Sequence, residues 1–350
     1  MTSRDFAASS NRVVSLDTRL KLNPNWVLSG QAMRTYTREL SGARLTGQSF
    51  LADLRHSGRH FTYYGLYSDR SPDFRSELGF IPRVDIRMME QFAQYFWKPT
   101  RSPVLLIGPD VRVNLNWNHD GRLQDWIVDA SFGGDFRGPS GMGCRHVNAF
   151  ELFQGYEFRK HQTDCGINTS WLKWLNINAD YGWGTSINYF PGSGLSPFLA
   201  DQQFAKFNWT LRPSSRLAIA ETYLYTRLAT RPGSTPLSYA ERQTIFNDHL
   251  LRLKVNVQFT RELSLRLIGD YHALLPNANL VAGERAKRLT ADVLVTYLVN
   301  PGTAIYVGYT DTHENLDIEA TTPPSLRRIR SPTTPTGRQF FAKVSYLLRF

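Results

Sequence analysis

The stretch Leu251-Arg-Leu-Lys-Val-Asn-Val-Gln-Phe259 decides the fold, because its odd-numbered residues are apolar and its even-numbered residues are polar or charged. Successive side chains of a β-strand point to opposite faces of a sheet, so this stretch is a strand with one apolar and one polar face. The same period of two recurs in Leu263–Tyr271, Val111–Trp117, Leu289–Tyr297 and Phe340–Phe350. No stretch of similar length has a sustained helical period. The chain is therefore predicted to be all-β.

Composition narrows the class of protein further. The longest apolar run, Val104–Ile107, is far shorter than the roughly 20 residues of a transmembrane helix. The 21 Phe, 16 Tyr and 8 Trp exclude a disordered chain, which holds few aromatic residues. The net charge of +11 would suggest nucleic acid as a partner, but the basic residues are spread singly apart from a short cluster at Leu326–Arg330. We therefore expect no nucleic-acid partner.

The connections between the expected strands alternate between short and long in the second half of the chain. Short turns contain Asn, Pro and Gly, as at Asn23–Asn25 and Asn118–Gly121, whereas longer segments such as Pro276–Lys287 are rich in small and charged residues. This alternation is typical of an up-and-down meander with tight turns at one end and long loops at the other. The Asn23 and Asn118 turns both resemble the tight-turn end, although an odd number of expected strands separates them.

Two architectures fit this pattern. A soluble sandwich or barrel hides its apolar face inside, whereas an outer-membrane barrel turns the apolar face to lipid and the polar face to an internal lumen. The expected strand length of about 10–12 residues matches a tilted crossing of a bilayer, and aromatic residues gather near strand ends as in interfacial girdles. The predicted fold class is therefore an all-β, antiparallel transmembrane up-and-down β-barrel of about 16 strands, with a range of about 14–18. Residues 1–10 are expected to form an N-terminal tail and residues 11–350 the barrel, in the outer membrane of a Gram-negative bacterium.

The strand pattern also predicts which charged residues face the lumen. A Lys or Arg that faces lipid at mid-depth costs about 2–4 kcal/mol, so the charged residues of the strands are expected on the lumen side. They are Arg252, Lys254, Arg266, Asp270, Asp292, Lys343 and Arg349. The final segment places Tyr346, Leu348 and Phe350 on one face, which resembles the insertion signal of Gram-negative outer-membrane barrels. Outer-membrane lipid and the barrel-assembly machinery are therefore the expected partners.

The segment Tyr67–Asp85 resembles a motif of the bacterial outer-membrane family known as domain of unknown function 5916. In that family Pro-Asp-Phe, Glu-Leu-Gly-Phe and Arg-x-Asp follow a Tyr in this order. The matching residues here are Pro72, Asp73, Phe74, Glu77, Leu78, Gly79, Phe80, Arg83 and Asp85. Asn11–Asp17 is similar to the family's Asn-x-Val-x-Gly-x-Asp strand, with Ser15 where Gly is usual, and Lys343–Phe350 is similar to its terminal strand. From the residues alone, Pro72–Phe74 is a turn whose ring anchors a fold-back and Gly79 needs unusual backbone angles, so a structural role is expected.

The resemblance implies an outer-membrane location and a barrel, but no activity. Members of the family carry an N-terminal module similar to family-nine carbohydrate-binding domains and then a first barrel portion. Neither part is present in this sequence, which leaves open whether residues 11–350 form a whole barrel or the C-terminal part of a larger one. Polysaccharide, bound through such a separate module, is the partner that the resemblance implies.

The two cysteines are predicted to be free thiols. Cys144 and Cys165 flank an expected strand over residues 147–159. At about 3.3 Å per residue, the two ends of such a strand lie too far apart for a disulfide.

Motifs with chemical meaning are few. The glycine-rich Phe132–Gly143 lacks a Walker lysine and an opening helix, so it is predicted to be a flexible surface loop and not a phosphate site. His56 and His60 flank a turn, where a spacing of four residues does not bring two metal ligands together. No metal site and no cofactor are therefore expected.

Acidic pairs are a further source of candidate chemistry. Glu284 with Asp292, or Asp311 with Glu314, would serve as a glycosidase couple only at a defined separation, which the sequence does not set. No catalytic carboxylate is predicted from them.

The leading functional hypothesis is an outer-membrane pore, or the translocation or anchoring portion of a larger surface protein. An open lumen would pass small polar solutes, with a weak bias toward anions from the surplus of basic groups. One alternative is a non-conducting anchor for a carbohydrate-binding module. Another is a barrel-wall hydrolase that uses His249 or His272, both on expected strands. The first eleven residues contain no export signal, so an exported protein would be numbered here from after its signal or from within a longer precursor.

Overall fold

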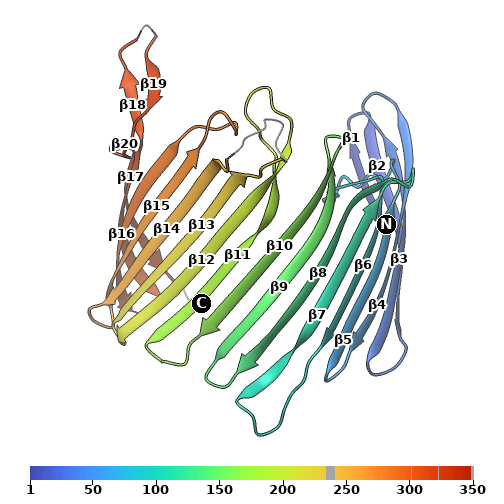
Figure 1. Cartoon of the computed structure of the whole chain (residues 1–350), viewed down its shortest axis with the longest axis horizontal. Coiled ribbons are helices and arrows are strands. Elements are labelled where there is room, and N and C mark those ends of the chain that lie inside the picture. Colours follow the sequence, from blue (N-terminus) through green and yellow to red (C-terminus); the bar gives the residue numbers. More distant parts are fainter. Residues whose placement is uncertain (234–240, 301, 322, 348–350) are drawn as a thin grey trace. The chain divides into compact units, whose positions relative to one another are not determined.

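The computed structural model describes residues 1–233, 241–300, 302–321 and 323–347. Within these ranges the chain forms twenty β-strands, and the prediction of an all-β antiparallel fold is confirmed (Figure 1). No helix among the described residues has the length and apolarity to cross a membrane. The chain divides into two compact units, which are described separately. The N-terminal unit comprises Met1–Asp135 and Cys144–His161, and the C-terminal unit comprises Phe136–Gly143 and Gln162–Phe350.

The N-terminal unit begins with seven antiparallel strands, each paired with the next along the chain. They are β1 (Thr2–Phe6), β2 (Ser9–Lys21), β3 (Trp26–Arg38), β4 (Arg44–Ser57), β5 (Phe61–Arg70), β6 (Ile86–Tyr95) and β7 (Val104–Trp117). From β2 onward these strands have 10 to 14 residues, the length that a tilted crossing of a bilayer requires. Residues 1–10, which were expected to form a tail, include strand β1 and the start of β2.

Three strands follow, and the first two of them extend through the segment Phe132–Gly143, which was predicted to be a loop. The three strands are β8 (Leu123–Phe136), β9 (Ser140–Phe153) and β10 (Tyr156–Thr169). The prediction of a flexible surface loop over Phe132–Gly143 was wrong, because most of it belongs to β8 and β9. Gly134 allows a close approach inside the sheet, since a Cβ atom there would lie 2.7 Å from the Leu106 carbonyl oxygen. Glycine in this segment therefore reflects close packing between strands.

The prediction of free thiols was also wrong, because Cys144 and Cys165 are both disulfide-bonded. The prediction assumed one straight strand over 147–159. In the structure this segment reverses direction between β9 and β10 at Gln154 and Gly155, whose φ angles are 51° and 85°. Two successive residues with positive φ form the tight hairpin turn that matches the twist of the flanking strands.

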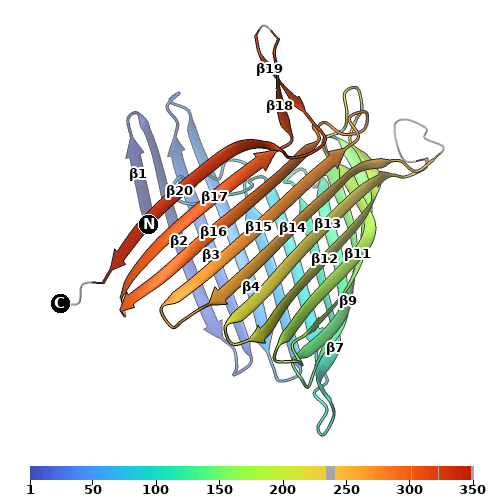
Figure 2. The ribbon, with the colours of Figure 1, turned by 90° about the vertical axis from the view of Figure 1, so that its left-hand side faces the viewer.

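The C-terminal unit continues the meander to the end of the described chain. Its further strands are β11 (Leu175–Asn188), β12 (Phe198–Ser214), β13 (Leu217–Thr230), β14 (Thr244–Gln258), β15 (Leu263–Pro276), β16 (Ala286–Asn300), β17 (Thr303–Glu314), β18 (Leu316–Glu319), β19 (Ser325–Arg328) and β20 (Thr334–Tyr346). Neighbours pair in sequence order from β11 to β17, and β17 then pairs with β20. β18 and β19 form a separate hairpin within the connection between β17 and β20 (Figure 2).

The predicted alternation of short and long connections is confirmed in this unit. Residues 215–216 and 259–262 make short turns at one end of the strands, whereas residues 189–197 and 277–285 make longer connections at the other end (Figure 2). Among the described residues, eighteen strands lie in the meander beside the β18–β19 hairpin, at the upper limit of the predicted range.

The structure also resolves the conflict between the Asn23 and Asn118 turns. Five strands, β3 to β7, separate them, so the two turns lie at opposite ends of the N-terminal unit. The expectation that both lie at the tight-turn end was wrong, because the length of a turn does not determine the end at which it lies. The Asn118 turn instead lies beside the long connection of residues 71–85, where the His119 backbone N–H donates to Asp85 Oδ1 at 3.0 Å.

Candidate functional site

The register of the C-terminal unit sorts charged and apolar side chains onto opposite faces. Residues directly opposite each other in an antiparallel pair point to the same face, and Arg252 of β14 lies opposite Asp270 of β15. Six of the seven predicted lumen residues share this face, which we call the polar face of the unit: Arg252, Lys254, Arg266, Asp270, Asp292 and Lys343. Arg349 lies outside the described residues, as do Leu348 and Phe350. That this face borders a lumen remains a prediction.

The opposite face of the same strands is apolar and uncovered within the described residues. Ten of its aliphatic or aromatic side chains are between 36% and 70% exposed: Leu251, Leu253, Leu267, Leu289, Val293, Val295, Ile305, Val307, Phe340 and Val344. Tyr346, the last residue of β20, belongs to this face as well. A contiguous apolar surface of this extent is unfavourable in water and is typical of a surface that contacts lipid or a partner.

The N-terminal unit has the same division. On its polar face Gln31 donates to Asp17 at 2.9 Å, and Arg55 forms an ion pair with Asp53 at 2.6 Å. The other face carries exposed apolar side chains from several strands, namely Val14, Leu16, Leu20, Phe50, Met89 and Val111. In both units the exposed apolar side chains gather on one side of the sheet, and the ion pairs Arg55–Asp53 and Arg252–Asp270 lie on the other.

Aromatic rings gather on the apolar face of the N-terminal unit at the end where the Asn23 turn lies. The Trp26 ring lies 4.7 Å from the His56 ring and 6.0 Å from the Tyr63 ring, and the Tyr95 ring lies 5.0 Å from the Trp97 ring. Amphipathic rings at strand ends are typical of the interface between lipid and water. With one lipid-compatible face and one polar face, the strands are those of a transmembrane β-barrel, which places the chain in a bacterial outer membrane.

Charged side chains on the polar face pair across strands. The Arg252 guanidinium donates to both carboxylate oxygens of Asp270, at 2.5 Å and 2.9 Å, and Thr310 donates to Asp292. Next to them, the Thr290 and Thr312 hydroxyls lie 3.3 Å apart. Arg252, Asp270 and Asp292, three of the predicted lumen residues, are therefore held by hydrogen bonds between strands.

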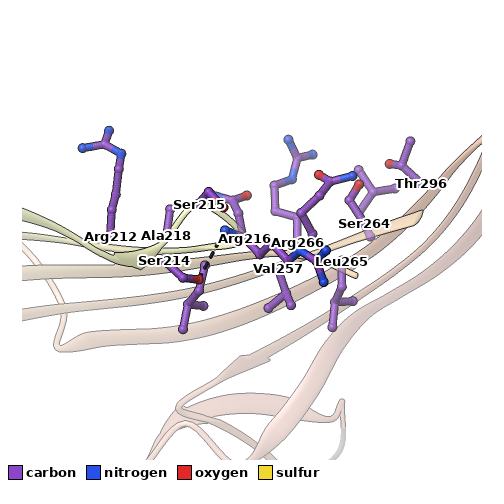
Figure 3. Close-up of a pocket in the computed structure, with 14 residues that line it drawn as sticks. Arg212, Ser214, Ser215, Arg216, Ala218, Val257, Ser264, Leu265, Arg266 and Thr296 are labelled. Atoms are coloured by element: carbon purple, nitrogen blue, oxygen red, sulfur yellow. Dashed lines mark hydrogen bonds between the residues drawn. The ribbon is translucent and has the colours of Figure 1, made fainter. Parts of the chain in front are cut away.

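One pocket on the polar face differs from these hydrogen-bonded pairs because its charges are all positive. It lies at the short-turn end of β12 to β16, has a volume of about 370 Å³, and is lined by Arg212, Arg216 and Arg266 (Figure 3). Hydroxyl and amide side chains complete its polar lining: Ser214, Ser215, Ser264, Thr296, Asn256 and Gln258. The sequence predicted Arg266 as a lumen residue but missed Arg212 and Arg216, although both flank a turn, because their place in one pocket depends on the register of four strands.

The two histidines of the hydrolase alternative do not share a site. His249 lies on the apolar face, where its Nδ1 atom is 2.9 Å from the Tyr223 hydroxyl, and its ring packs against the Tyr225 ring. His272 lies on the polar face, where its Nε2 atom is 2.7 Å from Asp248 Oδ1. The sheet separates the two rings, so no catalytic arrangement can use both.

Three of the four carboxylates proposed as acidic pairs are bound to arginines. Arg328 lies 3.3 Å from Glu284 and 3.7 Å from Glu314, and Arg338 lies 3.3 Å from Asp311. These ion pairs occupy carboxylate oxygens that a catalytic acid or base would have to present to a substrate.

The first half of the family-like motif packs onto the polar face of the N-terminal unit. Phe74 is fully buried, and a Cβ atom on Gly47 would lie 2.2 Å from the Phe74 Cα atom, so only glycine permits this approach. The Asn11 side chain donates to the Arg75 carbonyl oxygen at 3.1 Å and accepts from the Glu77 backbone N–H at 3.2 Å. The ring of the Pro-Asp-Phe turn thus anchors a fold-back onto β2, β3 and β4.

The other motif residues are spread along the same connection. Pro72 accepts through its carbonyl from the Arg75 guanidinium at 2.7 Å, whereas Asp73 is exposed. The expectation for Gly79 was wrong, because its φ is not positive and a Cβ atom there would meet only Ser76 Oγ, at 3.4 Å. Phe80 is 89% exposed.

The end of the motif binds the neighbouring hairpin. Arg83 forms an ion pair with Asp125 at 3.2 Å, and Asp85 binds His119, whose ring also reaches Asp69. The sequence missed His119 and Asp69, because neither stands in a recognisable motif. These contacts form a structural clamp that holds the end of the connection of residues 71–85 to the neighbouring hairpin.

No family model matches the sequence, and no curated protein matches it. Among solved structures, the chain is similar to the FrpB iron transporter from Neisseria meningitidis, with 11% identity and a TM-score of 0.44. That alignment covers 97% of this chain and 64% of FrpB. OmpT, an outer membrane protein of Vibrio cholerae, aligns with 8% identity and a TM-score of 0.37 over 96% of this chain and 99% of OmpT. The siderophore receptor PiuA from Acinetobacter baumannii aligns with 9% identity and a TM-score of 0.42, over 91% of this chain and 64% of PiuA.

Proposed function

We propose that the chain is the membrane-spanning part of an outer-membrane protein that passes small polar solutes along its polar face, with a weak preference for anions. The observation that carries the proposal is the division of the neighbouring strands β14, β15 and β16 into a lipid-compatible face and a charged face. A wall of this kind needs water on its charged side, because burying unpaired charge in lipid costs several kcal/mol (about 2–4 for Lys or Arg). The surplus of basic groups supplies the anion preference.

Conductance across a planar lipid bilayer tests the proposal. We expect discrete current steps after insertion of the detergent-folded protein, with a reversal potential in a salt gradient that indicates a modest preference for chloride over potassium. Inserted protein that gives no current at any voltage would contradict it. Insertion itself is checked separately by protection of the strands from protease in lipid vesicles.

One observation favours a second candidate, a non-conducting anchor. At the long-connection end of the C-terminal unit, the connections of residues 189–197 and 277–285 pack against each other over the polar face. The Leu280 carbonyl oxygen accepts from the Asn188 side chain at 2.8 Å and from the Gly192 backbone N–H at 3.1 Å. Leu280 is fully buried with Phe198, Ala200, Leu228 and Ile245. Connections packed in this way cover part of the polar face, as a plug would.

The family resemblance supports the anchor in a second way. A member of the family known as domain of unknown function 5916 would display a carbohydrate-binding module outside this chain, with polysaccharide as the partner of that module. The barrel-assembly machinery would insert the chain in either case. A purified full-length protein that binds polysaccharide and inserts into bilayers without conducting would favour the anchor over the pore.

A further inference from the structure

We propose that the arginine-lined pocket is a binding site for a small soluble oxyanion of the phosphate type. This proposal adds a ligand to the proposed function. It rests on that function in one respect, because water must reach the polar face for the anion to bind. Its defining feature is that Arg212, Arg216 and Arg266 line one cavity of about 370 Å³ with no carboxylate among its lining residues.

The charges in the pocket are not neutralised by the protein. Within the described part of the chain, none of the three arginines forms an ion pair, whereas Arg252 on the same face is paired with Asp270. A guanidinium group remains protonated at any physiological pH, so three of them along one pocket give it a positive potential. A bound anion would be attracted by all three charges.

The pocket also supplies hydrogen-bond donors. Figure 3 shows Arg212 pointing to the same side of the sheet as Ser264 and Thr296, whereas Val257 and Leu265 point to the other side. The Arg216 backbone N–H donates to Ser214 Oγ at 3.3 Å, which helps to order the turn between β12 and β13. Guanidinium groups with hydroxyls around them match the tetrahedral oxygens of phosphate, because each oxygen accepts charge-assisted hydrogen bonds.

The position of the pocket favours a soluble anion over a lipid headgroup. Arg266 lies opposite Asn256 and Leu294 on the polar face, whereas the lipid-compatible side chains lie on the other face. A phospholipid in the surrounding bilayer would contact the apolar face. The ligand is therefore expected to arrive from the aqueous side of the sheet.

Binding of inorganic phosphate to the detergent-folded protein tests the site. We would measure the heat of binding by titration calorimetry at constant ionic strength, with chloride replaced by phosphate. Arg212→Gln and Arg266→Gln remove one pocket charge each, and Lys343→Gln removes one charge from the same face outside the pocket. We expect saturable binding by the original protein, a loss of affinity of about tenfold or more in each arginine variant, and unchanged affinity in the lysine variant.

Two outcomes would overturn the proposal. One is the absence of saturable phosphate binding by folded protein, and the other is an equal loss of affinity in all three variants, which would indicate only the general charge of the polar face. A third arm uses vesicles that contain phosphatidylglycerol: arginine-dependent binding of this lipid without phosphate binding would assign the site to a headgroup and would also overturn the proposal.

The test separates this site from the proposed pore, because calorimetry in detergent does not require current. If the protein binds phosphate but does not conduct, the result would support the binding site and contradict the proposed pore. If the protein conducts but does not bind phosphate, the result would support the pore and contradict the binding site.

Discussion

At the scale of single residues, His119 links two segments that are distant in sequence. Its Nε2 atom lies 2.9 Å from Asp69 Oδ1, and its Nδ1 atom lies 2.9 Å from Asp85 Oδ1. The ring therefore bridges the two carboxylates, and the three groups form a clamp. Hydrogen bonds from the backbone and side chain of His119 lower the pKa of Asp85 below its ordinary value of 3.8.

The direction of this shift predicts how the clamp depends on pH. Because the pKa of Asp85 is lower in the folded protein, its ionised form stabilises the clamp fully above pH 3.8, and the contribution is lost as the pH falls through the folded pKa. Asp85→Asn removes the charge, so we expect faster amide exchange in residues 71–85 at pH 7, with the difference from the original protein vanishing well below pH 3.8.

Hydrogen exchange followed by mass spectrometry, compared at each pH between the two proteins, measures this effect. Asp73→Asn is the matched control, because Asp73 is an exposed carboxylate in the same connection. A difference that stays constant down to the lowest pH would show that the charge of Asp85 does not hold the clamp.

At the scale of elements, the connection between β5 and β6 offers two phenylalanines with opposite burial. Phe74 is fully buried above Gly47, whereas Phe80 is 89% exposed. We expect Phe74→Ala to lower the free energy of unfolding by about 3–5 kcal/mol, because it leaves a cavity where the ring anchors the connection. Phe80→Ala should change it by less than about 0.5 kcal/mol. Urea unfolding in lipid vesicles, followed by tryptophan fluorescence, gives both values, and equal effects would exclude an anchoring role for the Phe74 ring.

The elements also show what the sequence can predict and where it fails. The period of two along Leu251–Phe259 defines a strand and its faces without knowledge of any neighbour, and β14 confirms it. The turn at Gln154 and Gly155 has a single glycine as its only turn signal and divides an apparently continuous strand, so the strand boundaries there were missed and the disulfide with them. Local pattern determines faces, whereas a turn with a single glycine is identified only from the pairing between strands.

At the scale of the whole molecule, the same distinction applies to the candidate site. The charges of the polar face were predictable, because residues that alternate along a strand share a face whatever the register. That Arg212 and Arg266 line the same pocket was not, because it depends on how β12 to β15 are aligned with one another. A site that a single strand carries is therefore visible in the sequence, and a site that several strands assemble is not.

Two adjacent residues of β15 test the orientation of the entire sheet. Leu267 lies opposite Val255 and Val293 on the apolar face, whereas Ile268 lies opposite Lys254 and Asp292 on the polar face. We expect Leu267→Lys to destabilise the membrane-inserted protein by about 2–4 kcal/mol, because the ammonium group would face lipid. Ile268→Lys places the same group among charged and hydrated neighbours, so its cost should be at most about 1 kcal/mol.

Both variants are measured by urea unfolding in lipid vesicles, and the original protein provides the reference. The pair has the same charge, strand and depth, so only the face differs between the two substitutions. If the lipid lay on the charged side, Ile268→Lys would be the more destabilising change. Equal costs would mean that neither face contacts lipid, and the assignment of the chain to a membrane would then fail, because its exposed apolar face would have no hydrocarbon to meet.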